Sequence, residues 1–123
     1  MTIQNFWLKQ SKLIHWHKKP SFAFKKKNNN FVEWYPDGKV NIFHNCVTKN
    51  LELNLGKKIA IYFVNENKEI KSYTYKELDE NVNIFSNKIL YILKNQEISK
   101  SKIIIHSSAS IEATIAMLTC AKL

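Results

Sequence analysis

Hydrophobic positions between residues 75 and 93 recur every three or four residues, a spacing typical of a helix with one apolar face. Thr74 and Glu77 precede this pattern at the spacing of a capping box, so we expect the helix to begin at Tyr75. The expected buried face consists of Leu78, Val82, Phe85, Ile89, Ile92 and Leu93.

Short apolar runs lie on both sides of this helix, at residues 59–64 and 103–105. Two buried strands joined by an amphipathic helix form the βαβ unit of a parallel sheet, and we predict such a unit here. Residues 69–73 also have strand composition, and the polar residues 65–68 before them predict a hairpin with the first run. A second helix is expected after Ser110, which can cap it. Its apolar face would contain Ile111, Ile115 and Leu118.

The first part of the chain is rich in aromatic residues. Phe6, Leu13 and Trp16 predict an amphipathic helical arm that ends before Pro20. Residues 25–30, Lys-Lys-Lys-Asn-Asn-Asn, are polar and without periodicity, so we expect an exposed connector.

Turn and stop signals follow the connector. Pro36-Asp37-Gly38 predicts a tight turn in which Gly38 can take positive φ. A short helix is then expected, with Asn45 as its N-cap and with Gly56 after Leu55 as its stop.

The net charge of +9 raises the possibility of nucleic-acid binding. All nineteen basic residues are Lys, however, and Arg is the residue that makes bidentate phosphate and base contacts. A coding sequence rich in A and T accounts for the abundance of Lys, Asn and Ile without selection for binding. We therefore expect no nucleic-acid partner, although a small basic binding module stays open as an alternative.

No apolar run approaches the roughly 18 residues that cross a bilayer, and residues 1–5 do not resemble a secretory signal. We expect no membrane association and a cytoplasmic location. Cys46 and Cys120 form no C-x-x-C pair and are expected to be reduced thiols. Cys120 is expected to pack in a core or an interface.

The histidines of the chain are only weak candidates for a metal-binding or ligand-binding site. His15 and His17 could hold a metal, but the arm supplies no Cys, Asp or Glu to complete a site. His106 follows the predicted strand 103–105, where ligand sites of open α/β sheets gather, yet a loop histidine without such a role is the commoner case.

Trp16 and Trp34 are expected to be packing anchors rather than a platform for a ligand.

Three segments carry a resemblance when they are taken in order. They are Trp34-x-x-x-Gly-x-x-Asn-x-x-x-Asn-Cys46, Tyr-Thr-Tyr-Lys-Glu-Leu at residues 73–78, and Glu-Ala-x-x-Ala-Met-Leu-x-Cys-Ala-Lys-Leu at residues 112–123. Together they resemble the start of the AMP-forming short-chain acyl-CoA synthetases, a group that includes acetyl-CoA and propionyl-CoA synthetases. Phe6-Trp7 and the later Trp16 resemble the N-terminal extension of that family.

The resemblance implies an α/β fold, namely the incomplete N-terminal part of the large domain of an adenylate-forming enzyme. In this fold an aromatic helical arm is followed by a hairpin and a βαβ unit. Residues 1–58 would be the N-terminal extension, and residues 59–123 the truncated start of the AMP-binding domain. The implied reaction joins a short-chain carboxylate to CoA, with ATP converted to AMP and pyrophosphate.

The catalytic motifs of this family are not matched by residues of the chain. There is no Ser/Thr/Gly-rich phosphate loop ending in Lys, and the chain holds only two glycines. We therefore expect no catalytic, cofactor-binding or metal-binding residue here. The resemblance implies ATP, Mg²⁺ and CoA for the full-length enzyme, and the remaining ligase polypeptide as the partner. A non-catalytic gene remnant stays open as an alternative.

The last predicted helix reaches Leu123 without a Gly or Asn stop signal. A parallel sheet also needs more strands than this chain supplies. We therefore expect a truncated domain that exposes apolar surface and is prone to aggregate.

Overall fold

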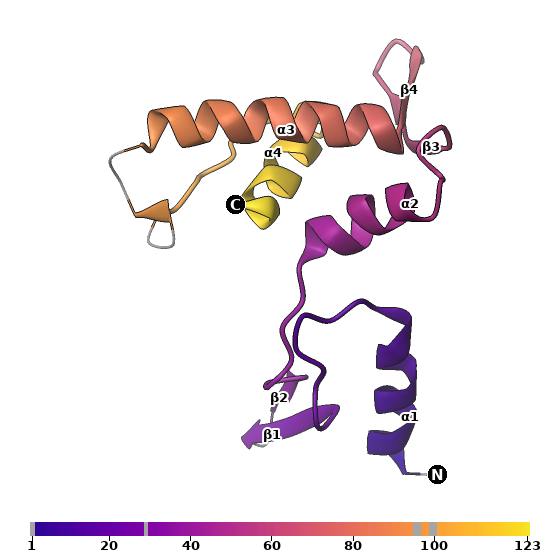
Figure 1. Ribbon diagram of the computed structural model, residues 1–123, viewed down its shortest axis with the longest axis vertical. Helices are drawn as coiled ribbons and strands as arrows, with labels where there is room; N and C mark the ends of the chain where they lie inside the picture. The colour runs from indigo at the N-terminus through magenta and orange to yellow at the C-terminus, as the bar shows by residue number, and fades with distance from the viewer. Residues whose placement is uncertain (1, 29, 95–96, 99–100) are drawn as a thin grey trace. The chain divides into compact units, whose positions relative to one another are not determined.

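The computed structural model describes residues 2–28, 30–94, 97–98 and 101–123 (Figure 1). The chain divides into two compact units, Met1–Asn41 and Ile42–Leu123, which we call the N-terminal unit and the C-terminal unit.

The N-terminal unit begins with helix α1 (Ile3–Gln10), which continues as the 3₁₀ helix η1 (Ser11–Leu13). The helical arm is confirmed, but the prediction that it includes Trp16 is wrong. The Ser11 carbonyl accepts both the Ile14 N–H over 3.2 Å, which closes the last 3₁₀ turn, and the Trp16 indole N–H over 2.8 Å. The chain is already extended at Ile14, well before Pro20.

Strand β1 (Phe24–Asn28) pairs with strand β2 (Phe31–Trp34) in an antiparallel hairpin. Residues 25–28 of the expected connector are therefore a strand, which corrects the prediction, whereas the predicted exposure of the three lysines is confirmed. Asn29 lies outside the described residues. Both strands are largely exposed, so they lack the alternation of apolar and polar residues by which a half-buried strand is recognised. The backbone ladder, rather than burial of side chains, defines this hairpin.

The tight turn after β2 is confirmed, since the Gly38 N–H donates to the Tyr35 carbonyl over 2.9 Å. Positive φ occurs at Tyr35, with φ 45°, and not at Gly38 as expected. Gly38 is needed for a different reason: a Cβ atom there would lie 2.6 Å from Cζ3 of Trp16. Gly38 therefore allows the turn to approach the indole ring closely.

The C-terminal unit begins with a helical segment from Ile42, which is π-helical over η2 (His44–Thr48) and ends in α2 (Lys49–Glu52). The short helix is confirmed, but Asn45 lies inside it and is not its N-cap, because the backbone is already helical at Phe43.

The expected stop of this helix at Gly56 is also wrong. The left-handed residue after the helix is Asn54, with φ 58°, and Gly56 has no positive φ. Asn tolerates the left-handed region better than most residues, so it can end a helix in the place of glycine.

A second hairpin joins β3 (Ile59–Val64) to β4 (Ile70–Thr74), as predicted. Helix α3 (Tyr75–Ile92) starts at the predicted residue with a complete capping box. Helix α4 (Ile111–Lys122) has the predicted cap, because the Ser110 hydroxyl accepts from the Ala113 N–H over 3.2 Å. Figure 1 shows α4 lying against α3 and the hairpin at the start of α3.

The buried residues of α3 follow one stripe of the helix: Leu78, Val82, Ser86 and Ile89. Two residues of the predicted face lie beside this stripe, since Phe85 is 37% exposed and Ile92 is 74% exposed. Successive residues of the stripe are four, four and three positions apart, close to the 3.6 residues of one helical turn. Phe85 comes one position before Ser86 and therefore lies to one side of the stripe.

The predicted βαβ unit is wrong. Among the described residues, the sheets are two antiparallel hairpins, and residues 103–105 belong to no strand. Ile104 is 93% exposed. An apolar run forms a parallel strand only where another strand offers its backbone groups and helices cover the faces, and β3 is paired with β4 alone in the described chain. The fold is a mixture of helices and strands, compatible with an N-terminal part of an α/β domain.

The core of the C-terminal unit is a hydrophobic cluster around Phe43, Val47, Leu78 and Val82. Lys122 contributes to this packing, because its Nζ lies 4.7 Å from the ring centroid of Phe43 and bonds the Asn83 side-chain oxygen. None of the helices in the described residues has the length and hydropathy that crossing a membrane would require.

Candidate functional site

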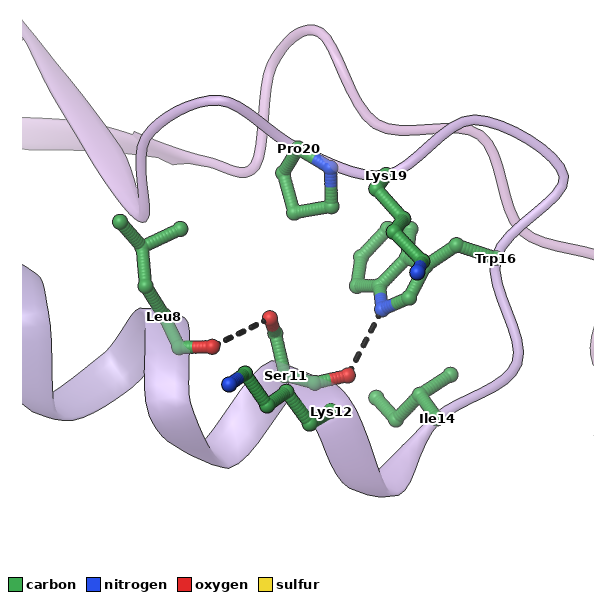
Figure 2. A pocket seen from close by; sticks show the side chains of 7 residues that line it. All are labelled: Leu8, Ser11, Lys12, Ile14, Trp16, Lys19 and Pro20. Atoms are coloured by element: carbon green, nitrogen blue, oxygen red, sulfur yellow. Dashed lines mark hydrogen bonds between the residues drawn. The ribbon is translucent and has the colours of Figure 1, made fainter.

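A cavity of about 570 Å³ opens in the N-terminal unit beside the junction of α1 and η1 (Figure 2). Its volume falls in the range of ligand-binding pockets. Four apolar side chains, two lysines and one serine line it: Leu8, Ile14, Trp16, Pro20, Lys12, Lys19 and Ser11. We call this cavity the arm groove.

Two hydrogen bonds shape the arm groove. The Ser11 hydroxyl donates to the Leu8 carbonyl over 2.8 Å, and the Trp16 indole N–H donates to the Ser11 carbonyl over 2.8 Å. Figure 2 shows that the second bond folds the chain back over η1, with the indole closing one end of the groove and Leu8 at the other. The groove therefore exists because the chain leaves the helix at Ile14 and the indole of Trp16 returns to bond the end of η1.

The position of Trp16 is fixed from its other side by the turn after β2. The rings of Trp16 and Tyr35 meet edge to face, with centroids 5.2 Å apart, and Gly38 leaves space for the indole. Backbone bonds join the same segments, because the N–H groups of His17 and Lys18 donate to the Lys39 carbonyl over 2.8 and 3.2 Å. Trp16 is thus a packing anchor, as predicted.

Helix α1 is clamped to the hairpin by one side chain. Gln4 Oε1 accepts the Ala23 N–H over 2.9 Å, and Gln4 Nε2 donates to the Phe24 carbonyl over 2.8 Å. Aromatic rings complete the contact, with Trp34 edge to face against both Trp7 (5.3 Å) and Phe24 (5.4 Å). Trp34 is therefore also a packing anchor, and these contacts give the arm groove a fixed frame.

The charge of the N-terminal unit is strongly positive. It holds eight lysines and two acidic residues, a net charge of +6, whereas the longer C-terminal unit has a net charge of +3. Asp37 accepts the Ser21 backbone N–H with both carboxylate oxygens, over 3.0 and 3.2 Å. Its hydrogen bonds with Ser21 lower the pKa of Asp37 below its usual value, and nearby Lys18 lowers it further. One of the two carboxylates of the N-terminal unit therefore already has a hydrogen-bond partner within that unit.

The two lysines of the arm groove, Lys12 and Lys19, are exposed. In the part of the chain that the structure describes, neither has an ion-pair partner. The groove thus combines an apolar floor with two uncompensated positive charges, an arrangement suited to an anionic group attached to an apolar body.

The other candidates from the sequence do not gather around a site. His106 is exposed and follows no strand. The rings of His15 and His17 lie 5.6 Å apart, and the described residues hold no group of three side chains suited to a metal ion.

Cys46 and Cys120 are both free thiols. Cys120 is exposed, so the prediction that it packs in a core is wrong. Its neighbour Thr119 is the residue that lies on the buried side of α4.

Sequence reasoning did not find the arm groove. Lys12 and Lys19 read as ordinary surface lysines, and the residues of the lining come together only through the bond between Trp16 and Ser11. The available signal was weak: an aromatic residue between two lysines, shortly before a proline.

Comparison with protein families gives a match over residues 2–46 to a model described as the acetyl-coenzyme A synthetase N-terminus. This match covers most of the N-terminal unit and the beginning of the next helix. It agrees with the resemblance drawn from the aromatic arm and the Asn-Cys segment.

Curated relatives extend the similarity along the chain. The acetyl-coenzyme A synthetase of Cupriavidus metallidurans is 32% identical over 123 residues, that of Bartonella henselae 36% over 127, and that of Streptomyces coelicolor 30% over 118. These alignments cover 96–98% of this chain but 18% of each relative. The chain therefore spans less than a fifth of the length of the enzymes that it matches.

Proposed function

Because the chain is related over nearly its whole length to the N-terminal segment of acetyl-coenzyme A synthetases, we propose that it is the structural N-terminal segment of such a ligase. The ligase would convert ATP, a short-chain carboxylate and CoA to acyl-CoA, AMP and pyrophosphate. The alignment over 98% of the chain is the observation that carries this proposal.

In this proposal the chain has a structural role, and the remaining ligase polypeptide provides the catalytic and ligand-binding residues. We assign the binding of ATP, Mg²⁺ and CoA to residues outside this chain, since its two glycines serve a close approach and a loop rather than a phosphate cradle. Acting with a cytoplasmic enzyme, the chain would share its location.

The exposed apolar surface of the C-terminal unit supports a scaffold role. Tyr62 and Val64 on β3 are 66% and 57% exposed, and Ile104 in the predicted strand is 93% exposed. β3 pairs with β4, and the described residues provide no partner for its other edge. Apolar side chains beside an unpaired strand edge favour addition of further strands. The remaining ligase polypeptide is the proposed source of those strands.

A chimera tests the proposal. The aligned N-terminal segment of the Cupriavidus metallidurans enzyme is replaced by this chain, and acetate-dependent exchange between ATP and pyrophosphate is measured. We expect activity within about tenfold of the parent enzyme, because a scaffold that docks correctly leaves the catalytic residues in place. The 123-residue chain alone, assayed in parallel, should give no exchange.

Either of two results would contradict the proposal. Exchange by the isolated chain would show that it carries the chemistry itself. A chimera that is soluble and monodisperse but inactive would instead favour the gene-remnant alternative, because a drifted segment no longer supports the enzyme.

A further inference from the structure

The arm groove has an asymmetry that bears on what it can bind. Its floor is apolar, while Lys12 extends from η1 on one wall and Lys19 from the facing segment on the other (Figure 2). Positive charge is therefore divided between two walls instead of converging on one point.

The polar groups of Ser11, which also lines the groove, are already engaged. The Ser11 hydroxyl proton and the Ser11 carbonyl are both used inside the protein, in the bonds to Leu8 and from Trp16. A compact anion such as free phosphate is best held by several donors that converge on it, often backbone N–H groups. The arm groove offers separated lysines instead, which favours a ligand whose negative charges are also separated.

An extended peptide has this distribution of charge. Its side chains alternate between two opposite faces, so one apolar side chain can enter the groove while acidic side chains two positions before and after it, on the same face, reach the two walls. We propose that the arm groove binds an extended acidic segment of the ligase polypeptide, with an apolar side chain between Leu8 and Trp16 and carboxylates at Lys12 and Lys19. This inference rests on the proposed function, which supplies that polypeptide as the partner.

Single-stranded nucleic acid is the other anion that an aromatic groove could attract. Stacking needs an accessible ring face, but Trp16 is half-buried, has Gly38 within van der Waals distance and packs on Tyr35. The indole N–H is also engaged with Ser11. The groove thus favours an apolar side chain over a base.

Peptide binding tests the chemistry of the groove directly. The chain, fused to maltose-binding protein for solubility, is titrated against a fluorescent peptide, Ser-Gly-Glu-Asp-Leu-Asp-Glu-Gly-Ser, and polarisation is recorded. The double variant Lys12→Glu/Lys19→Glu should weaken binding about tenfold or more, because each reversal removes an attraction and adds a repulsion. The matched control Lys26→Glu/Lys27→Glu changes the net charge equally, but on the hairpin, and should bind nearly as well as the parent.

Three peptide controls sharpen this test. Replacing the acidic residues by Asn and Gln, or the leucine by serine, should reduce binding, and a peptide with lysines in place of the acids should bind the Lys12→Glu/Lys19→Glu variant. An equal loss of peptide affinity in both double variants would refute the groove proposal, because it would indicate attraction by overall charge alone. Binding of oligothymidylate as tight as that of the peptide would also overturn the assignment.

The chimera then separates this inference from the proposed function. The same two double variants are made in the active chimera, and resistance to limited proteolysis at the arm is measured together with exchange activity. We expect faster cleavage of the arm in Lys12→Glu/Lys19→Glu and little change in the control. An active chimera whose arm is equally protected in both variants would refute the groove proposal and leave the proposed function intact. An inactive chimera would contradict the proposed function, while the peptide titration would still test whether the arm groove binds an acidic peptide.

Discussion

The two units of this chain are held together by different forces. In the C-terminal unit, buried hydrophobic side chains from the helical segment at residues 42–52 and from α3 form a core, with Val47 and Val82 fully buried. In the N-terminal unit, Ala23 is the one fully buried hydrophobic residue among those described, and edge-to-face aromatic pairs and side-chain clamps take the place of a core.

This difference predicts two kinds of sensitivity. Burial of apolar surface is spread over many contacts, so the C-terminal unit should respond in proportion to the volume removed. Polar clamps are concentrated in single side chains, so the N-terminal unit should respond strongly at a few positions and weakly elsewhere. Hydrogen–deuterium exchange read by mass spectrometry distinguishes the units, because it reports the protection of each segment separately.

Leu78→Ala should have the largest effect. Leu78 is 3% exposed and belongs to the hydrophobic core, and removal of a buried leucine side chain costs about 2–5 kcal/mol. We expect exchange throughout α3 and β3 to accelerate while α1 and β1 keep their protection. Leu53→Ala, at a site 58% exposed, is the matched control and should change little. Equal deprotection of both units by Leu78→Ala would mean that they share one cooperative core.

Gly38→Ala should come next. The new Cβ would lie 2.6 Å from Cζ3 and 3.0 Å from Cε3 of Trp16, whose indole is held by Ser11, and overpacking of this kind costs about 1–3 kcal/mol. Amides of residues 11–18 and 35–39 should exchange faster. Gly56→Ala is the natural control, because the nearest atom to its Cβ would be Leu51 Cδ2 at 3.4 Å. Similar effects of the two substitutions would show that loss of glycine flexibility, not the indole, is responsible.

Gln4→Ala should have a comparable or somewhat smaller effect that is confined to the N-terminal unit. The substitution leaves the Ala23 N–H and the Phe24 carbonyl without their partner, at about 1–3 kcal/mol for buried groups and less where water can enter. Exchange at Ala23 should rise about tenfold. Gln10→Ala on the same helix is the control. Unchanged exchange at Ala23 in Gln4→Ala would refute the clamp.

Thr74→Ala should have the smallest effect, about 1 kcal/mol at the start of α3, because it removes the N-cap. Thr48→Ala, at a helical position where no side-chain cap is formed, serves as the control. Faster exchange should be limited to the first turn of α3 and its junction with β4. A loss as large as that of Leu78→Ala would mean that the cap nucleates the whole unit.

The same cap predicts a dependence on pH. The Glu77 carboxylate accepts from the Thr74 N–H and hydroxyl, each over 2.8 Å, and the backbone bond followed by the hydroxyl bond lowers the pKa of Glu77. A lowered folded-state pKa gives stability that is present above the unfolded pKa of about 4.3 and is lost as pH falls through the folded value. An NMR titration of the Glu77 carboxyl should show this lowered pKa, and Thr74→Ala should return it toward the ordinary value. A Glu77 pKa at or above the ordinary value in the unsubstituted chain would contradict the capping box.

Local signals placed several elements correctly, although the expected cap at Asn45 and stop at Gly56 were wrong. The start of α3 at Tyr75 depends on Thr74 and Glu77, three residues apart, and the cap of α4 depends on Ser110 and the amide of Ala113. The hairpin of β3 and β4 likewise follows from two adjacent runs and a short polar link. These features form between near neighbours in the chain, so residue types and spacing were enough to place them.

The two errors in strand prediction arose where the outcome depends on a distant partner. Residues 103–105 have strand composition, but whether they form a strand depends on a neighbouring edge that the hairpin does not provide in the described residues. The lysines at 25–27 form a strand although their composition suggests a connector, because β2 supplies the backbone partners.

The sequence by itself therefore determined the starts of α3 and α4, the second hairpin, the turn at Gly38 and the family resemblance. Only the tertiary structure decided that Gly38 serves Trp16 and that Gln4 clamps α1 to the hairpin. It also decided that Lys12 and Lys19 face one cavity. The physical reason is the same in each case: the partner that gives the side chain its role lies at least seven residues away, where neither periodicity nor capping rules reach.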